Sequence, residues 1–175
     1  MRYLIIILSL LTKVSFGQIN GLTDCFSNQP DQTKCLKFGH LGFETDDLTF
    51  KKISKRVDTI IDKADTSSLA YILPTQKRKV PKEFKLFKPS FLEVTKVNGQ
   101  IQSLQLYGYS KANNLDFYGI NLGTTTSDLI KSFGQPTNTR PFIGIKGEIW
   151  EYRDKRYSFV VKNDIVVIIK ISRTG

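Results

Sequence analysis

Hydrophobic and polar residues follow two different periods along this chain, and each period predicts a different element. Across residues 46–64, apolar side chains recur at intervals of three and four, which predicts an amphipathic helix. Across residues 91–97 and 101–109 they alternate, and the Asn98-Gly99 pair between these runs is typical of a two-residue hairpin turn. The alternation directs four residues toward the core: Leu92, Val94, Leu104 and Leu106.

The later part of the chain repeats this order of a helix followed by strands. Hydroxyl and acidic residues open the run 122–129, and Gly134 and Pro136 follow it, which predicts a short capped helix. The run reads Leu-Gly-x-x-Thr-x-Asp-Leu, as does the run 41–48. Further strands are expected at 68–73, 148–153, 157–161 and 165–172, with a loop at 137–145.

The last hairpin aligns with the first one when Asn163 is set on Asn98. Helix and hairpin therefore echo in the same order, which indicates an internal duplication. We predict an α+β fold of two tandem helix-plus-antiparallel-sheet units, residues 39–112 and 113–175, packed as one compact protein.

The segment 1–17 is typical of a cleavable export signal. Arg2 precedes an apolar core at 3–11, and Ser15-Phe16-Gly17 has the small-x-small pattern of a cleavage site. The apolar run is shorter than the roughly 20 residues that a membrane-spanning helix needs. We therefore expect a secreted or periplasmic mature chain without a transmembrane segment.

Cys25 and Cys35 lie in a polar arm, residues 18–38, that follows the signal. An even cysteine count at short spacing in an exported chain predicts a disulfide. This bond would tie down an arm that lacks apolar residues to anchor it. A redox or metal pair is disfavoured, because the spacing is not Cys-x-x-Cys and no cluster of further ligands is nearby.

The chain is basic, with 26 Lys and Arg against 16 Asp and Glu, which favours anionic partners. The surplus is densest at 76–89, where Phe84 and Phe87 interleave with Lys77, Arg78, Lys79, Lys82, Lys85 and Lys88. We favour a solvated hairpin loop or a lysine-guarded edge strand for this basic segment. The alternative is a binding patch for a membrane surface or polyanion; no nucleic-acid partner is expected, because nothing resembling a nucleic-acid module surrounds the segment.

Residues suited to catalysis are few. The chain has one histidine, His40, without an identifiable partner, and its glycines lack the spacing of a phosphate-binding loop. We expect a non-catalytic protein without a metal or cofactor. Two carboxylates distant in sequence can still meet in space, so a carboxylate-based hydrolase stays as a lesser alternative.

Aromatic residues suggest where a partner protein binds. Tyr107 and Tyr109 share the outward face of the first hairpin with Glu93, Thr95 and Gln105, a mixture suited to recognition. An ordinary solvated sheet face explains the same pattern equally well. By contrast, Trp150 and Tyr152 lie opposite a more polar strand face, and we expect them in the core.

The second unit resembles the repeat of β-lactamase inhibitor protein-like domains, which also occurs in small outer-membrane assembly lipoproteins of the SmpA/OmlA type. The matching residues are Gly123, Thr125, Asp128, Leu129, Phe133, Gly134, Pro136, Trp150 and Tyr152. The resemblance covers residues 118–171, whereas the first unit lacks a Trp-x-Tyr equivalent. It implies an exported, non-catalytic protein that binds another protein through its sheet faces, as an inhibitor, an immunity-type protein or an envelope accessory factor.

Overall fold

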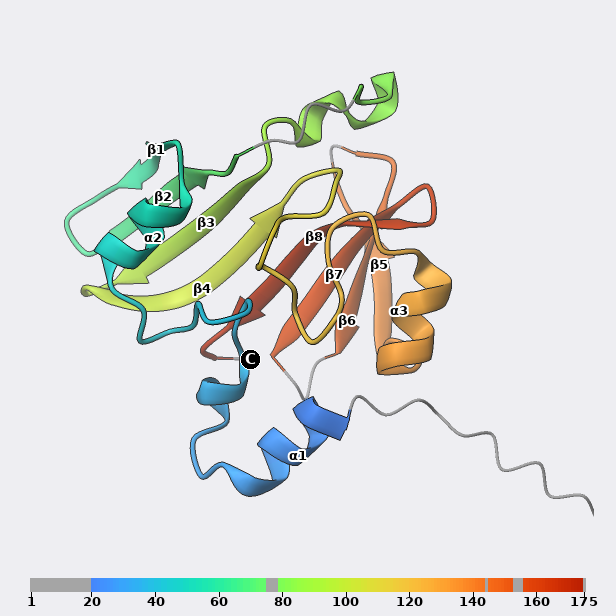
Figure 1. Cartoon of the computed structure of the whole chain (residues 1–175), viewed down its shortest axis with the longest axis horizontal. Helices are drawn as coiled ribbons and strands as arrows, with labels where there is room; N and C mark the ends of the chain where they lie inside the picture. Colours follow the sequence, from blue (N-terminus) through green and yellow to red (C-terminus); the bar gives the residue numbers. More distant parts are fainter. Residues whose placement is uncertain (1–19, 75–78, 144, 153–155, 175) are drawn as a thin grey trace, which may run out of the picture.

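One antiparallel β-sheet organises the fold (Figure 1). The computed structural model describes residues 20–74, 79–143, 145–152 and 156–174. Within these ranges eight strands pair in the order β1-β2-β3-β4-β8-β7-β6-β5. They are β1 (Arg56–Asp62), β2 (Thr66–Ile72), β3 (Phe91–Val97), β4 (Gln100–Tyr107), β5 (Asn138–Pro141), β6 (Glu148–Tyr152), β7 (Tyr157–Lys162) and β8 (Ile165–Ser172). The predicted α+β class is confirmed; the expected export signal at 1–17 lies outside the described residues.

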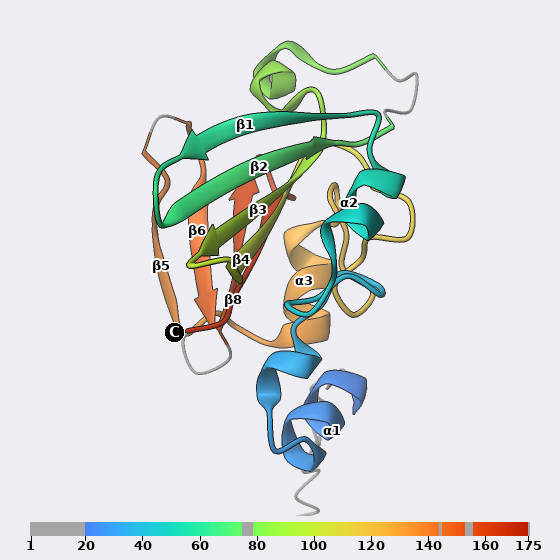
Figure 2. The ribbon, with the colours of Figure 1, turned by 90° about the vertical axis from the view of Figure 1, so that its left-hand side faces the viewer.

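The α-helices lie on one side of the sheet, as Figure 2 shows. They are α1 (Asn20–Asn28), α2 (Asp47–Ile53) and α3 (Thr126–Phe133), and two 3-10 helices, η1 (Gln32–Cys35) and η2 (Lys82–Phe87), complete the described helices. Between the α-helices and the sheet lies the main core, where Phe38, Phe50, Phe117 and Leu129 have no exposed surface. The four residues predicted to point inward from the first hairpin are in this core, each at most 1 % exposed: Leu92, Val94, Leu104 and Leu106.

The two halves of the sheet meet where β4 pairs with β8. On either side of this junction, an α-helix precedes four strands in the chain: α2 precedes β1 to β4, and α3 precedes β5 to β8. In both hairpins next to the junction, an asparagine at the turn has a positive φ, Asn98 at 50° and Asn163 at 48°. This agrees with the register in which these two residues were aligned.

The backbone geometry before α2 recurs before α3 when Phe38 is aligned with Phe117. The shared Leu-Gly-x-x-Thr-x-Asp-Leu pattern gives a different register, because it matches Leu41 to Leu122. Isolated β-bridges join Phe38 to Leu41 and Phe117 to Ile120. After each bridge, a threonine hydroxyl accepts a hydrogen bond from the backbone N–H of the residue three positions before it: Thr45 from Gly42, and Thr124 from Asn121.

Helix N-caps follow in the same structural register. The Asp46 carboxylate caps α2 by accepting from the Thr49 N–H, and the Thr125 hydroxyl caps α3 by accepting from the Asp128 N–H. Leu41 therefore corresponds in structure to Ile120 and not to Leu122, so the shared Leu-Gly pair was out of register.

The helix predicted over residues 46–64 is wrong beyond Ile53. Residues 56–62 form strand β1, which pairs with β2 at the edge of the sheet. Val57, Thr59, Ile60 and Ile61 are β-branched and favour a strand, although their spacing also fits a helical stripe. Because β1 is an edge strand with mostly exposed residues, it lacks the clear alternation of a half-buried strand.

The N-terminal arm packs onto the core, which corrects the expectation that it lacks apolar anchors. A disulfide joins Cys25 to Cys35, as predicted. Leu22 of α1 is 3 % exposed, and Leu36, which follows η1, is fully buried in the main core. The disulfide therefore closes a segment that hydrophobic contacts also hold.

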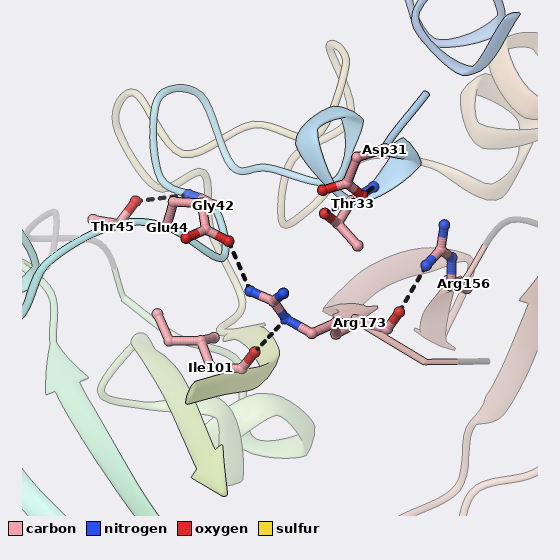
Figure 3. A network of polar contacts seen from close by, with 8 residues as sticks. All are labelled: Asp31, Thr33, Gly42, Glu44, Thr45, Ile101, Arg156 and Arg173. Carbon is pink, nitrogen blue, oxygen red and sulfur yellow. Dashed lines mark hydrogen bonds and ion pairs between the residues drawn. The ribbon is translucent and has the colours of Figure 1, made fainter. Parts of the chain in front are cut away.

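Two arginines near the end of the chain connect distant segments (Figure 3). Arg173 donates to the Ile101 carbonyl oxygen at 3.1 Å and to the Glu44 carboxylate at 2.8 Å. Its guanidinium carbon also lies 5.4 Å from the centre of the Phe43 ring. Arg156 donates to the carbonyl oxygen of Arg173 at 2.7 Å. This network fixes the end of β8 to the start of β4 and to the loop before α2.

Candidate functional site

The outer face of the sheet, opposite the α-helices, carries a polar row of cross-strand neighbours. Strand pairing places Gln105 of β4 beside Lys170 of β8, Lys170 beside Ser158 of β7, and Ser158 beside Glu151 of β6. Glu93 extends the row on one side, beside Gln105. One face of six neighbouring strands is therefore polar along this line, since Asn138 of β5 continues it beyond Glu151.

A parallel apolar row lies two residues along each strand, on the same face. It runs from Phe91 beside Tyr107, through Ile168 and Val160, to Ile149. Tyr107, Ile168, Val160 and Ile149 of this row belong to a second hydrophobic cluster, separate from the main core. The outer face thus joins a polar strip to an apolar one, in which Ile149, Val160 and Ile168 are 8, 6 and 3 % exposed.

A groove of about 680 Å³ follows both rows across the second half of the sheet. Gln105, Ser158 and Lys170 line it from the polar row, and Ile149, Val160 and Ile168 line it from the apolar row. The loop between β5 and β6 forms a rim, where the side chain of Ile143 is 96 % exposed. This isoleucine is the most exposed of the large apolar residues that the structure describes.

Charges in the groove are mainly basic. Arg140 donates to the Glu151 carboxylate at 2.7 Å, and the Asn138 amide donates to the same carboxylate at 2.9 Å. Lys170 is exposed and makes no ion pair with any residue that the structure describes. The groove therefore presents one acidic side chain that is already engaged and an exposed lysine two strands away from it.

The five predicted contact residues lie on or next to this outer face, but they are half-buried rather than fully exposed. Glu93 accepts a hydrogen bond from the Ser68 hydroxyl at 2.6 Å, and Thr95 pairs with Ser103 across the strands. Of the five, only Gln105 lines the groove. Their role in binding stays a prediction.

Tyr107 and Tyr109 belong to the second hydrophobic cluster. The Tyr107 ring stacks on Phe91 at 4.5 Å, and its hydroxyl donates to the Gln105 side-chain oxygen at 3.1 Å. Burial, and after it the nearby Glu93 carboxylate, raises the pKa of Tyr107 above its ordinary value. Tyr109 packs against Phe84 of η2 at 4.6 Å. Both tyrosines therefore pack against neighbouring aromatic residues of the outer face, in addition to any contact that they make with a partner protein.

The basic segment lies in the long connection of the hairpin formed by β2 and β3, which confirms the expected hairpin loop and makes the edge strand wrong. Within this connection, residues 82–87 form the 3-10 helix η2. Phe84 and Phe87, each 5 % exposed, attach it to the second hydrophobic cluster. The edge of the sheet on that side is β1 instead. The lysines that the structure describes here are all exposed: Lys79, Lys82, Lys85 and Lys88. Lys77 and Arg78 lie outside the described residues.

Carboxylates do converge in a smaller hollow of about 420 Å³, near the start of α2. Asp47 pairs with Lys96 at 2.6 Å, Glu44 pairs with Arg173 at 2.8 Å, and Asp46 caps the helix. The hydrogen bonds from Thr49 lower the pKa of Asp46. Each of these carboxylates has a structural contact that accounts for its position.

Other candidate chemistry is sparse in the described part of the chain. His40 is exposed, and no group of three or more His, Cys, Asp or Glu side chains is arranged to hold a metal ion among the described residues. No described helix has the length and apolar character to cross a bilayer. Comparison with protein-family models, with curated proteins and with solved structures found no match.

Sequence reasoning missed most of the groove. Alternation assigns Ser158 and Lys170 to a face of their own strand, but it does not show that β8 pairs with β4. That pairing brings Gln105 beside Lys170, although the two residues are far apart in the chain. The rim was missed because residues 137–145 have the Pro and Gly content of a loop, and the short strand β5 shows no alternation.

Proposed function

We propose that this chain is an exported, non-catalytic module that binds another protein through the outer face of its sheet. One observation carries the proposal: a polar row and an apolar row lie side by side in an open groove, and Ile143 is exposed at its rim. Protein interfaces combine an apolar centre with a polar surround in this way. Gln105 connects the groove with the first hairpin, so that hairpin forms one side of the contact face.

The tandem arrangement of two helix-plus-sheet units belongs to the same proposal. Two recurrences support it. Before each of α2 and α3, the chain forms an isolated β-bridge, a hydrogen bond to a threonine hydroxyl and a side-chain N-cap. The hairpin turns at Asn98 and Asn163 also match. Two such units place two hairpins side by side and so produce a face broad enough for a partner protein. The resemblance to β-lactamase inhibitor protein-like domains points the same way.

Export of the mature chain is supported by the disulfide and by the signal-like segment 1–17. The partner is accordingly expected outside the cytoplasm, where the chain acts as an inhibitor, an immunity-type protein or an envelope accessory factor.

Site-specific photo-crosslinking tests the contact face directly. A photoreactive residue replaces Ile143 at the groove rim, and in the control it replaces Leu48 of α2, which is 62 % exposed on the helix side of the sheet. We expect position 143 to crosslink one protein in the native envelope fraction and position 48 not to do so. Equal crosslinking from both positions contradicts the proposed face.

The captured protein is then purified for affinity measurements. We expect Ile143→Ser to weaken its binding at least tenfold, the effect of removing a buried anchor, and Leu48→Ser to leave binding unchanged. Tyr107→Phe keeps the ring stack on Phe91 and removes only the hydroxyl that meets Gln105. Unchanged affinity in both Ile143→Ser and Tyr107→Phe removes the groove as the binding site.

A further inference from the structure

The 3-10 helix η2 sorts its side chains into three ridges, because residues three apart eclipse one another in this type of helix. One ridge holds Lys82 and Lys85, and Lys88 follows as the C-cap residue. A second ridge holds the buried Phe84 and Phe87. Leu86 lies on the third ridge, where 75 % of its surface is exposed. The helix thus attaches by its phenylalanines and presents lysines and a leucine outward.

Aromatic contacts fix η2 to the body of the protein. Phe84 lies 4.6 Å from the Tyr109 ring and 6.4 Å from the Phe87 ring. Lys162, in the last hairpin, also reaches this attachment, with its ammonium 5.9 Å from the centre of the Phe84 ring. Figure 1 shows this segment in light green at the upper end of the molecule, projecting beyond the strands. Its exposed ridges are therefore held in place and accessible to a flat surface.

The charge of this projection is strongly positive. Lys79, Lys82, Lys85 and Lys88 are exposed, and none of them makes an ion pair with a described residue. Glu83 is the one acidic residue of η2. A cluster of four to eight basic residues at a surface attracts anionic lipid headgroups, each lysine strengthening binding about fivefold.

We propose that η2 docks the protein on an anionic lipid surface. In this arrangement the lysines contact headgroup phosphates, and Leu86 enters the boundary between headgroups and acyl chains. The exposed leucine favours a lipid over a soluble polyanion, because a polyanion offers no apolar phase in which to bury it. This site is independent of the groove, whose proposed partner is a protein.

Vesicle binding tests the proposal with the intact, disulfide-bonded protein. The probe is a vesicle of phosphatidylglycerol and phosphatidylcholine, compared with phosphatidylcholine alone and with heparin. We expect Lys82→Gln, Lys85→Gln and Lys88→Gln together to weaken binding to the anionic vesicle about 100-fold, and Leu86→Ser to weaken it about tenfold. The matched controls are Leu48→Ser and the triple variant Lys51→Gln, Lys52→Gln and Lys63→Gln, whose lysines are also exposed.

Equal losses in the two triple variants mean that net charge alone drives binding, and they overturn the proposal. Heparin binding as tight as vesicle binding, with no effect of Leu86→Ser on either, identifies a soluble polyanion as the ligand and overturns it as well. Insertion has its own readout: Leu86→Trp in a Trp150→Phe background should shift its fluorescence to the blue on anionic vesicles and not with heparin. Absence of that shift on vesicles removes the insertion step and with it the proposed site, and circular dichroism checks that each variant is folded.

Discussion

Phe117 is the residue whose removal should damage the fold most. Its side chain has no exposed surface, and its ring meets those of Phe133, Tyr157 and Phe159 at 5.7, 5.1 and 6.2 Å. It therefore connects the turn before α3 with the helix itself and with β7. Truncation to alanine removes a fully buried ring and leaves a cavity that these rigid aromatic neighbours cannot easily fill.

We expect Phe117→Ala to lower the free energy of unfolding by about 3–5 kcal/mol, the range for a buried phenylalanine. A change of this size shifts the melting temperature of a domain of this length by roughly 6–20 °C. Urea denaturation followed by far-UV circular dichroism measures it, with Trp150 fluorescence as a second probe. Phe117→Leu is the matched control, expected to cost about 1.5 kcal/mol or less because it keeps most of the buried volume.

A loss below about 1 kcal/mol for Phe117→Ala refutes the reasoning, because it means that the neighbouring rings close the cavity or that the ring is not buried in solution. A loss in Phe117→Leu as large as in Phe117→Ala shows that ring geometry, rather than buried volume, is what matters.

Three further predictions concern other parts of the fold. Replacing Cys25 and Cys35 by alanine should cost about 3 kcal/mol or less, because the disulfide closes a short loop, and a thermal melt measures this. Gly39→Ala should destabilise by more than about 1 kcal/mol in urea denaturation, because Gly39 has φ +57° and an added Cβ would collide with the Asn114 carbonyl oxygen. Burial raises the pKa of Tyr152 to about 12, so at pH values between 10 and 12 unfolding releases the proton of its hydroxyl. The free energy of unfolding should therefore fall as pH rises from 10 toward 12. Thermal melts recorded across that range measure this fall, which should be less steep in Tyr152→Phe. At neutral pH, Tyr152→Phe should lower stability, because it removes the hydrogen bond that the Tyr152 hydroxyl donates to the Gly134 carbonyl oxygen.

Elements with strong local signals could be predicted from the sequence. Helix α3 has a threonine cap and a glycine stop, and the hairpin of β3 and β4 has Asn98 and Gly99 at its turn. In each of these cases, a few neighbouring residues determine the backbone conformation. The inward face of the hairpin could also be assigned, because burial of one face imposes a strict alternation.

Elements that depend on distant partners were harder to predict. Residues 56–62 form an edge strand because β2 is available for pairing, whereas their own spacing is equally compatible with a helix. The basic segment became a helix attached by Phe84 and Phe87, since the second hydrophobic cluster into which these rings pack is assembled from strands later in the chain. The groove depends on the same strands, so no local pattern reveals it.

The junction between β4 and β8 has a consequence for the order in which the chain folds. Pairings within each half of the sheet are local, whereas the junction joins Leu104 to Ile171 and Leu106 to Ile169. Closing so long a loop costs more entropy than forming a hairpin, so this pairing is expected late in folding. Until then, the facing edges of β4 and β8 are unpaired, and two growing chains at high concentration could exchange halves through them. The junction of β4 and β8, which makes the outer face broad, is thus also the pairing whose late formation leaves the protein open to domain swapping.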